Sequence, residues 1–202
     1  MEYAAVIQQG ARRWERWLRA SFSPRYEPGA LIRKIREDLR GLQTVSTEAR
    51  SAQFSMENGT AFSVHEHVEA RFLMSMALAQ FILAVPACAA GQGTILVQHR
   101  GAWRRTGVTF TPSRDADARV RRVCIELAQD EALRAALMPL DFTSCTIDCT
   151  PPGFAVRLQH FGACELVGTV PRLQRYIKLS SDQRESLLAS FTALRRVLGV
   201  QP

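Results

Sequence analysis

Apolar residues recur along the chain at two spacings, and each spacing predicts one kind of element. In residues 1–20 and 31–42 they recur every three or four positions, which is typical of amphipathic helices. The same spacing returns in 113–138, with a bend near Gln129-Asp130, and in 180–199. These four stretches therefore predict helices.

Alternation of apolar and polar residues predicts strands in the remaining parts. The Asn58-Gly59 pair supplies the positive φ angles of a tight turn, so we expect a hairpin around it. Two more hairpins are expected around Gly101 and Pro151-Pro152-Gly153, and residues 175–179 add a further strand. The predicted strand segments are 49–56, 60–68, 72–85, 94–100, 106–111, 143–149 and 154–160.

The order of these elements predicts an α+β fold. Strand-rich stretches are separated from helical ones, which favours an antiparallel sheet of four or five strands covered by helices, with an N-terminal helical extension. No linker rich in Pro, Gly or Ser divides the chain, so we expect a single domain over residues 1–202. Its expected parts are 1–42 (N-terminal helical segment), 49–111 (hairpin-rich sheet), 113–138 (helix), 143–179 (hairpin and strand) and 180–199 (C-terminal helix).

One stretch, residues 72–90, fits either a buried core segment or a membrane span. Its nineteen residues are mostly apolar and none is charged, so its length just reaches that of a spanning helix. Ser75, Gln80 and Pro86 interrupt it, as is common in the buried elements of folded domains. The sequence is therefore compatible with both interpretations, a buried core segment and a membrane span.

The composition predicts a folded globular body and excludes wholesale disorder. Of the 202 residues, 47% are hydrophobic and 22% are charged, close to the globular average. The formal net charge is +7, which taken alone suggests an anionic partner. Because only Lys34 and Lys178 among the 26 basic residues are lysine, the excess of arginine is also what a GC-rich coding sequence would produce. The sequence does not separate a functional arginine excess from a codon-driven one.

Cysteine usage and the N-terminus favour a cytoplasmic protein of a bacterium. Five cysteines are an odd number, which fits reduced thiols better than a disulfide framework. The stretch Met1 to Arg13 has no apolar core after a basic start, so it is not typical of a secretory signal.

Three residues of one predicted strand form a candidate metal site. His65, His67 and Glu69 are two apart, so in a strand their side chains share one face. Two imidazoles and a carboxylate are a ligand set for Zn²⁺ or Fe²⁺. The same alternation also arises in any strand with one polar, solvent-facing side.

Four further residues are possible zinc ligands. Cys145, Cys149, His160 and Cys164 lie within twenty residues. In an extended segment the first two sulfur atoms would be roughly 13 Å apart, too far to share one ion. Small buried cysteines are the ordinary interpretation.

The first predicted helix is a candidate surface for an anionic membrane or a partner groove. Trp14 and Trp17 lie beside Arg12, Arg16 and Arg19. Tryptophan at the boundary between the apolar and polar sides of a helix, with arginine on the solvent-facing side, is typical of helices that lie on membranes. A helix that packs on its own sheet has the same pattern.

A basic cluster around one tryptophan is a candidate nucleic-acid contact. Arg100, Arg104 and Arg105 flank Trp103, and this arrangement could bind phosphates while the indole stacks on a base. Pairing of arginines with nearby acidic residues would remove this role, and we expect nucleic acid not to be the partner.

Catalytic signatures are missing from the sequence. It contains no Gly-x-Ser-x-Gly, Walker loop, His-Glu-x-x-His or Cys-x-x-Cys motif. We therefore expect a binding or interaction module whose partner is a protein or an apolar small ligand, with no cofactor other than a possible divalent metal. A metal-dependent enzyme built on His65, His67 and Glu69 is one alternative, and a peripheral membrane protein attached through the first helix is another.

Overall fold

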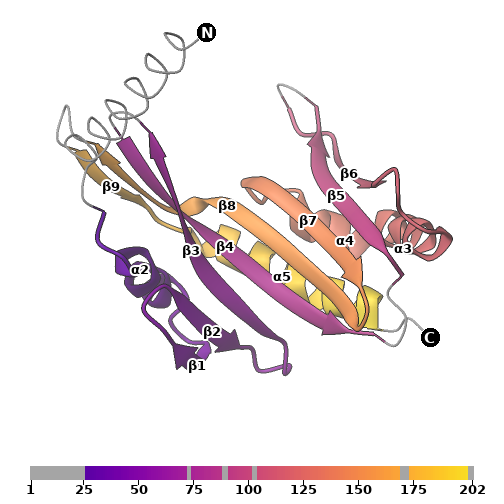
Figure 1. Ribbon diagram of the computed structural model, residues 1–202, viewed down its shortest axis with the longest axis horizontal. Helices are drawn as coiled ribbons and strands as arrows, with labels where there is room; N and C mark the ends of the chain where they lie inside the picture. Colours follow the sequence, from indigo (N-terminus) through magenta and orange to yellow (C-terminus); the bar gives the residue numbers. More distant parts are fainter. Residues whose placement is uncertain (1–25, 72–73, 88–90, 102–103, 169–172, 200–202) are drawn as a thin grey trace, which may run out of the picture.

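A computed structural model describes residues 26–71, 74–87, 91–101, 104–168 and 173–199. Within these residues one antiparallel sheet of nine strands dominates, and four helices lie beside it (Figure 1). The strands are β1 (Gln43–Thr47), β2 (Ser51–Ser55), β3 (Ala61–Arg71), β4 (Met74–Pro86), β5 (Gly93–Arg100), β6 (Gly107–Pro112), β7 (Phe142–Thr150), β8 (Gly153–Gly168) and β9 (Leu173–Ile177). The helices are α2 (Ala30–Asp38), α3 (Ala118–Gln129), α4 (Glu131–Leu137) and α5 (Ser181–Gly199).

The two longest strands, β4 and β8, form the centre of the sheet. The strand order is β1-β2-β3-β4-β8-β7-β5-β6, and β9 also pairs with β8. β8 reaches both neighbours because it changes partner along its length: residues 153–160 pair with β7, and residues 164–168 pair with β9. Between them the register with β4 shifts, and Ala163 has a left-handed φ of 63°. This irregularity is a β-bulge, which bends the strand and redirects its edge.

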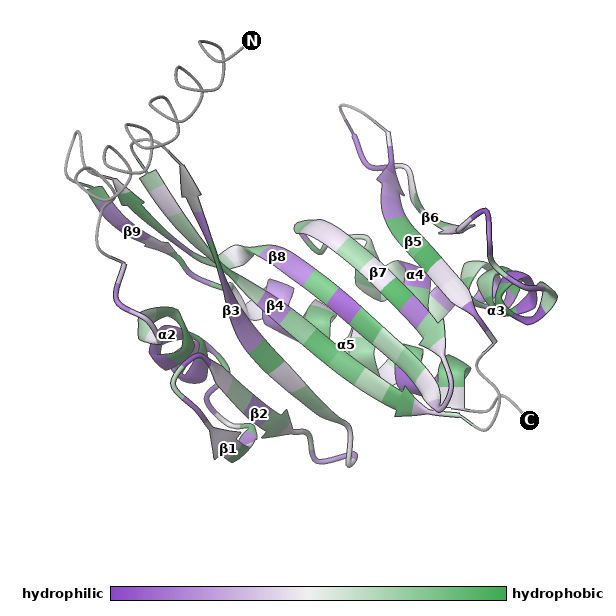
Figure 2. Ribbon diagram, in the orientation of Figure 1, coloured by the Kyte–Doolittle hydropathy of each residue, from purple (hydrophilic) through white to green (hydrophobic). Residues whose placement is uncertain are grey.

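Alternating side chains give the sheet a buried inner face and an exposed outer face. The inner face carries five buried apolar residues of β4, which are Ala77, Ala79, Phe81, Leu83 and Val85, and Leu78 on the other face is buried as well. The same alternation appears as stripes of opposite hydropathy along β8 (Figure 2). The outer face is therefore the one whose side chains meet solvent.

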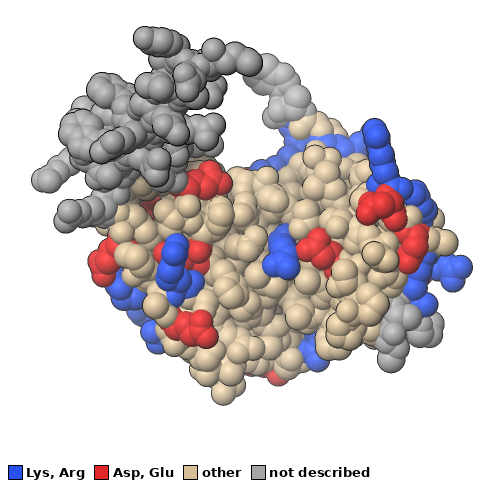
Figure 3. All heavy atoms as spheres, in the orientation of Figure 1, with Lys and Arg blue, Asp and Glu red and all other residues tan. Residues whose placement is uncertain are grey.

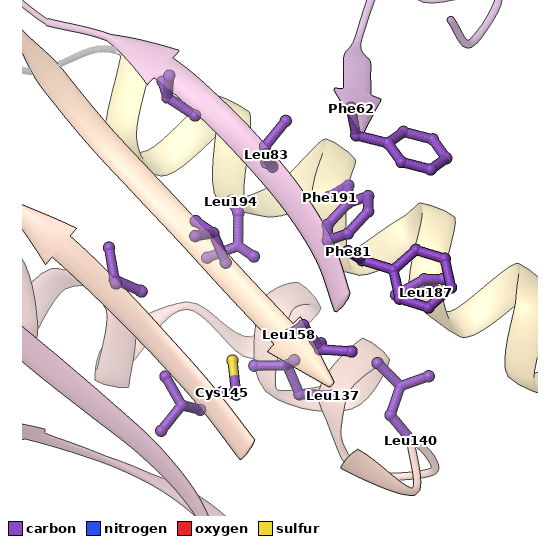
Figure 4. Packing of buried hydrophobic residues seen from close by; sticks show 14 of the residues in the cluster. Phe62, Phe81, Leu83, Leu137, Leu140, Cys145, Leu158, Leu187, Phe191 and Leu194 are labelled. Carbon is purple, nitrogen blue, oxygen red and sulfur yellow. The ribbon is translucent and has the colours of Figure 1, made fainter. Parts of the chain in front are cut away.

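Helix α5 packs against the inner face and closes the centre of the core. The ring centroid of Phe62 lies 5.1 Å from that of Phe191 on α5 and 6.4 Å from that of Phe81 on β4. Leu187 and Leu194 fill the space beside them (Figure 4). Burial of such side chains stabilises the fold by about 1.5–3 kcal/mol each.

The predicted helix 113–138 is two helices, as its expected bend suggested. The carboxylate of Asp117 accepts a hydrogen bond from the Val120 N–H at 2.8 Å and begins α3. Asp130 ends α3 and in turn accepts from the Leu133 N–H at 2.8 Å, which begins α4. Aspartate at an N-cap satisfies N–H groups that lack a partner within the helix.

The prediction of an α+β fold with helices covering the sheet is wrong. Of the described residues, 47% are in strands and only 29% are in helices, and these helices do not clearly cover the one large sheet. Eight strands side by side are roughly 34 Å wide at about 4.8 Å per strand. The nine residues of α2 and the seven of α4 give helices only about 14 Å and 10 Å long, too short to cover such a sheet. The predicted N-terminal helix of residues 1–20 lies outside the described residues.

The three predicted hairpins are confirmed. β2 pairs with β3 across Gly59, which has a φ of 74°, β5 pairs with β6 across Gly101, and β7 pairs with β8. Within the ambiguous stretch 72–90, residues 74–86 form strand β4 of the sheet, and the inner side chains of this strand are buried. Among the described residues, no helix combines the length and hydropathy needed to cross a membrane.

Candidate functional site: a notch beside strand β3

The sheet has a step in its edge where β2 is shorter than β3. The pairing of the two strands ends at Ser51 opposite His65, followed by one hydrogen bond from the Glu66 N–H to the Arg50 carbonyl at 2.9 Å. β3 continues to Arg71 in regular register with β4. In the described part of the chain, no strand lies beside residues 67–71 of β3 on this side. A cavity of about 570 Å³ opens here, and we call it the notch; it is lined by residues 48–51 and 65–68.

A buried carboxylate forms the base of the notch. The side chain of Glu66 is fully buried. Its Oε2 accepts hydrogen bonds from the Tyr26 hydroxyl and the Gly29 N–H, both at 2.8 Å, and its Oε1 accepts from Nε of Arg50 at 3.1 Å. Burial, together with the carboxylate, raises the pKa of Tyr26, so its hydroxyl remains a donor. Glu66 is thus held by three donors from two different segments, the stretch before α2 and the turn between β1 and β2.

The charge balance of the notch is set by two exposed side chains. Arg50 is anchored through Nε, and its positive charge is compensated by Glu66. Glu48 accepts a hydrogen bond from the Ser51 hydroxyl at 3.0 Å, and among the described residues no cation pairs with it. The Glu48 carboxylate is therefore the uncompensated charge of the notch.

Gly29 allows the chain before α2 to approach the notch closely. Its φ is 83°, and a Cβ there would lie only 2.2 Å from the Ala49 carbonyl oxygen. Only glycine combines this backbone conformation with so close an approach. The segment that carries Tyr26 is thereby fixed against the turn between β1 and β2.

Two more carboxylates fix α2 on the sheet next to the notch. Oε1 of the fully buried Glu165 accepts from Lys34 Nζ at 2.5 Å and from Gln174 Nε2 at 2.8 Å. Asp38 accepts from the Tyr176 hydroxyl at 2.6 Å and from the Leu179 N–H at 2.9 Å. These contacts join α2 to β8 and β9, and so help to fix the segment before α2 that donates to Glu66.

The predicted metal ligands lie along β3 at the border of the notch. His65 and His67 are exposed on the outer face of β3, and Glu69 is partly exposed. Nε2 of His65 lies 3.0 Å from the Ser63 hydroxyl. Among the described residues, no three His, Cys, Asp or Glu side chains are grouped so that they could hold a metal ion.

The second set of possible zinc ligands lies in the core. Cys145, Cys149 and Cys164 are buried free thiols, and burial raises the pKa of Cys145 to about 12 and that of Cys149 to about 11. The buried imidazole of His160 lies 2.6 Å from Oε1 of Gln183 and 3.0 Å from the Gly162 carbonyl, and burial lowers its pKa. Because burial raises their pKa, the three buried thiols remain protonated and unreactive near neutral pH.

The arginine-rich candidates are only partly described. Arg12, Trp14, Arg16, Trp17, Arg19 and Trp103 lie outside the described residues. Arg100 and Arg104 are exposed, whereas Arg105 forms an ion pair with Asp141 and donates to the Met138 carbonyl at 3.3 Å. On the face shown in Figure 3, basic and acidic side chains are interspersed. That face therefore carries no continuous basic stripe.

Sequence reasoning missed Glu48, Arg50 and Glu66. Glu66 had a detectable signal, because it occupies an apolar-face position of β3 between Val64 and Val68, and a buried carboxylate requires partners. Arg50 and Glu48 gave no signal. They lie in a polar turn, and their role depends on where β2 ends.

Residues 37–198 match the model of a protein family described as protein of unknown function (DUF3156), and the chain belongs to this family. The match includes the notch and every described strand. Neither the curated proteins nor the solved structures contain a match to this chain.

Proposed function

We propose that this protein is a binding module that takes an extended segment of another protein into the notch, where the segment pairs with β3 as an added strand. The observation that carries this proposal is the length of β3, which continues through Arg71 after β2 ends opposite His65. Recognition by strand addition uses such an edge: main-chain hydrogen bonds give affinity, and adjacent pockets give specificity.

The backbone of β3 has the groups that strand addition requires. In an antiparallel ladder, alternate residues direct both N–H and C=O to the same neighbour. Because the Glu66 N–H bonds to the β2 side, Val68 and Ala70 direct their groups to that side as well. Within the described residues, 67–71 have no strand neighbour on this side over a length of about 17 Å, at about 3.3 Å per residue. This length fits a segment of about five residues.

The side chains of the notch favour a basic segment. Arg50 is neutralised by Glu66, whereas Glu48 has no cation partner among the described residues. A lysine or arginine of the incoming segment would compensate Glu48, and an acidic segment would be repelled. The partner is therefore expected to carry Lys or Arg near the end of its added strand.

The edge of β1 is a weaker candidate for the same role. All five residues of β1 are exposed, and its register with β2 shifts between Thr44 and Ser46. A bulge of this kind protects an edge against pairing. β3 shows no such irregularity along its pairing with β4.

The experiment is a selection from a phage-displayed library of random dodecapeptides on the purified protein. We expect enrichment of sequences with Lys or Arg, and at least tenfold weaker binding of a selected peptide by the Val68→Pro variant, because proline removes the N–H that faces the notch. Val45→Pro, at the bulge of β1, is the matched control and should bind as the native protein does. Equal binding by all three proteins, or no enrichment over bare support, would overturn the proposal.

The cytoplasmic location is also a proposal. It is supported by Cys124, Cys145, Cys149 and Cys164, which are free thiols and fit a reducing compartment. The metal-dependent enzyme and the peripheral membrane protein stay predictions, which metal analysis and vesicle binding of the full chain would test.

A further inference from the structure

A second cavity lies at the other end of β3 and is independent of the notch. It has a volume of about 570 Å³ and forms where the turn between β2 and β3 meets the end of β4 and the last turns of α5. Asn58, Thr60 and Thr192 contribute polar groups, and Val85 and Pro86 contribute an apolar wall. Arg195 and Arg196 supply its charges.

The turn at this cavity is held in place by hydrogen bonds of the Asn58 side chain and of Arg195. The Asn58 side chain accepts from the Thr60 N–H at 2.9 Å and donates to the Thr192 hydroxyl at 3.0 Å. Nη1 of Arg195 donates to the Asn58 carbonyl at 3.3 Å and to the Thr60 hydroxyl at 3.1 Å. The guanidinium of Arg195 is therefore positioned before any ligand arrives.

The two arginines differ in their charge compensation. Arg196 donates to Oδ2 of Asp130 at 2.6 Å and is neutralised by it. The acceptors of Arg195 are a carbonyl and a hydroxyl, and no carboxylate contacts it within the described residues. The C-terminal end of α5 carries a partial negative charge that opposes an anion. The full charge of Arg195 exceeds that partial charge, so the cavity has a positive balance.

We infer that this cavity binds a small ligand that carries a carboxylate or phosphate on an apolar body. Arg195 supplies the charge and a planar set of donors that match an oxyanion. Val85 and Pro86 supply the surface for the apolar part. Arg196 cannot replace Arg195 because Asp130 already compensates it.

The experiment is a calorimetric titration of the full chain with phenyl phosphate, benzoate and inorganic phosphate at low ionic strength. We expect saturable binding of an aryl anion that is tighter than that of inorganic phosphate, and about tenfold weaker binding, or about 1.4 kcal/mol, for the Arg195→Gln variant. Arg122→Gln is the matched control, because Arg122 is an exposed residue of α3 that does not line the cavity. It removes the same formal charge and should leave the affinity unchanged.

Arg195→Lys provides a second readout. It keeps the charge and loses the planar donors, so its affinity should fall between those of the native protein and Arg195→Gln. The inference is overturned if the native protein shows no saturable binding of phenyl phosphate or benzoate at millimolar concentrations. It is equally overturned if Arg122→Gln weakens binding as much as Arg195→Gln, since binding would then depend on net charge alone.

Discussion

The ion pair between Lys34 and Glu165 predicts a stability effect that differs between its two partners. The carboxylate is fully buried, whereas the lysine side chain is 33% exposed. Oε1 of Glu165 has two donors, and Oε2 has no hydrogen-bond partner. Replacing the lysine therefore leaves a buried charge without a counter-ion. Replacing the glutamate leaves a lysine that can reach water.

The expected magnitudes follow from this asymmetry. Breaking a buried ion pair from one side costs about 3–5 kcal/mol, and the partial exposure of Lys34 moves Lys34→Met to about 3 kcal/mol. For Glu165→Leu, the loss of two hydrogen bonds is offset by removal of an unsatisfied buried oxygen, which itself costs about 1–3 kcal/mol. The net effect of Glu165→Leu is therefore within about 1 kcal/mol of zero.

The assay is equilibrium unfolding in urea followed by circular dichroism, with an unchanged slope as the sign of two-state behaviour. In thermal unfolding, Lys34→Met should lower Tm by roughly 6–12 °C, since 1 kcal/mol corresponds to about 2–4 °C for a chain of this length. The control is Lys178→Met, the same change at a lysine whose side chain is 74% exposed and whose Nζ lies 3.8 Å from Asp38. It should cost less than about 1 kcal/mol.

Two results would refute the reasoning. One is a cost for Lys34→Met that equals the cost for Lys178→Met. The other is a Glu165→Leu variant that is less stable than Lys34→Met. The double variant Lys34→Met with Glu165→Leu should recover most of the stability lost in Lys34→Met, because the uncompensated carboxylate is gone.

Three further predictions concern the backbone, the thiols and pH. Gly29→Ala should lower the free energy of unfolding in urea by several kcal/mol, and Gly59→Ala by only about 1–2 kcal/mol. Both glycines have a positive φ, but only at Gly29 would a Cβ lie against a backbone oxygen. Equal losses of stability would contradict this. Burial raises the pKa of the four described thiols, Cys124, Cys145, Cys149 and Cys164. In a Cys88→Ser variant, which leaves only these four thiols, Ellman's reagent at pH 8 should therefore react with them only after denaturant is added. Since burial lowers the pKa of His160 in the folded state, the unfolded chain takes up the proton first, and stability should fall as pH drops below about 6.5. His160→Gln should reduce this loss, and an equal loss in the variant and the native protein would contradict the prediction.

Local features of the fold could be predicted from the sequence because the residues that cause them are adjacent. Asn58-Gly59 sets a hairpin turn by its own backbone preferences, and Asp130 divides α3 from α4 by capping the second helix. The size of the sheet could not be predicted in this way. β1 is exposed at every position, so it lacks the alternation that marks a strand. β8 continues beyond residue 160, and its residues 164–168 pair with β9, which comes later in the chain.

The candidate site was predictable only in part for the same reason. Alternation along β3 places His65 and His67 on one face, as expected. The position of Glu66 on the apolar face indicates that it needs partners. Which partners it finds, Tyr26 from before α2 and Arg50 from the turn after β1, depends on three segments that meet only in the folded chain.

The central pairing of β4 with β8 has a consequence for synthesis. Met74 pairs with Gly168 and Pro86 with Gly153, so the paired residues are separated by roughly 70–90 positions, a separation that slows folding because a long loop must close first. While a ribosome makes residues 87–152, β4 has an unpaired edge and no charged residue to protect it. The nascent chain therefore carries its most apolar strand exposed for several seconds, at about 5–20 residues per second. Chaperone demand should accordingly peak before residue 153 is added and decline once β8 has emerged.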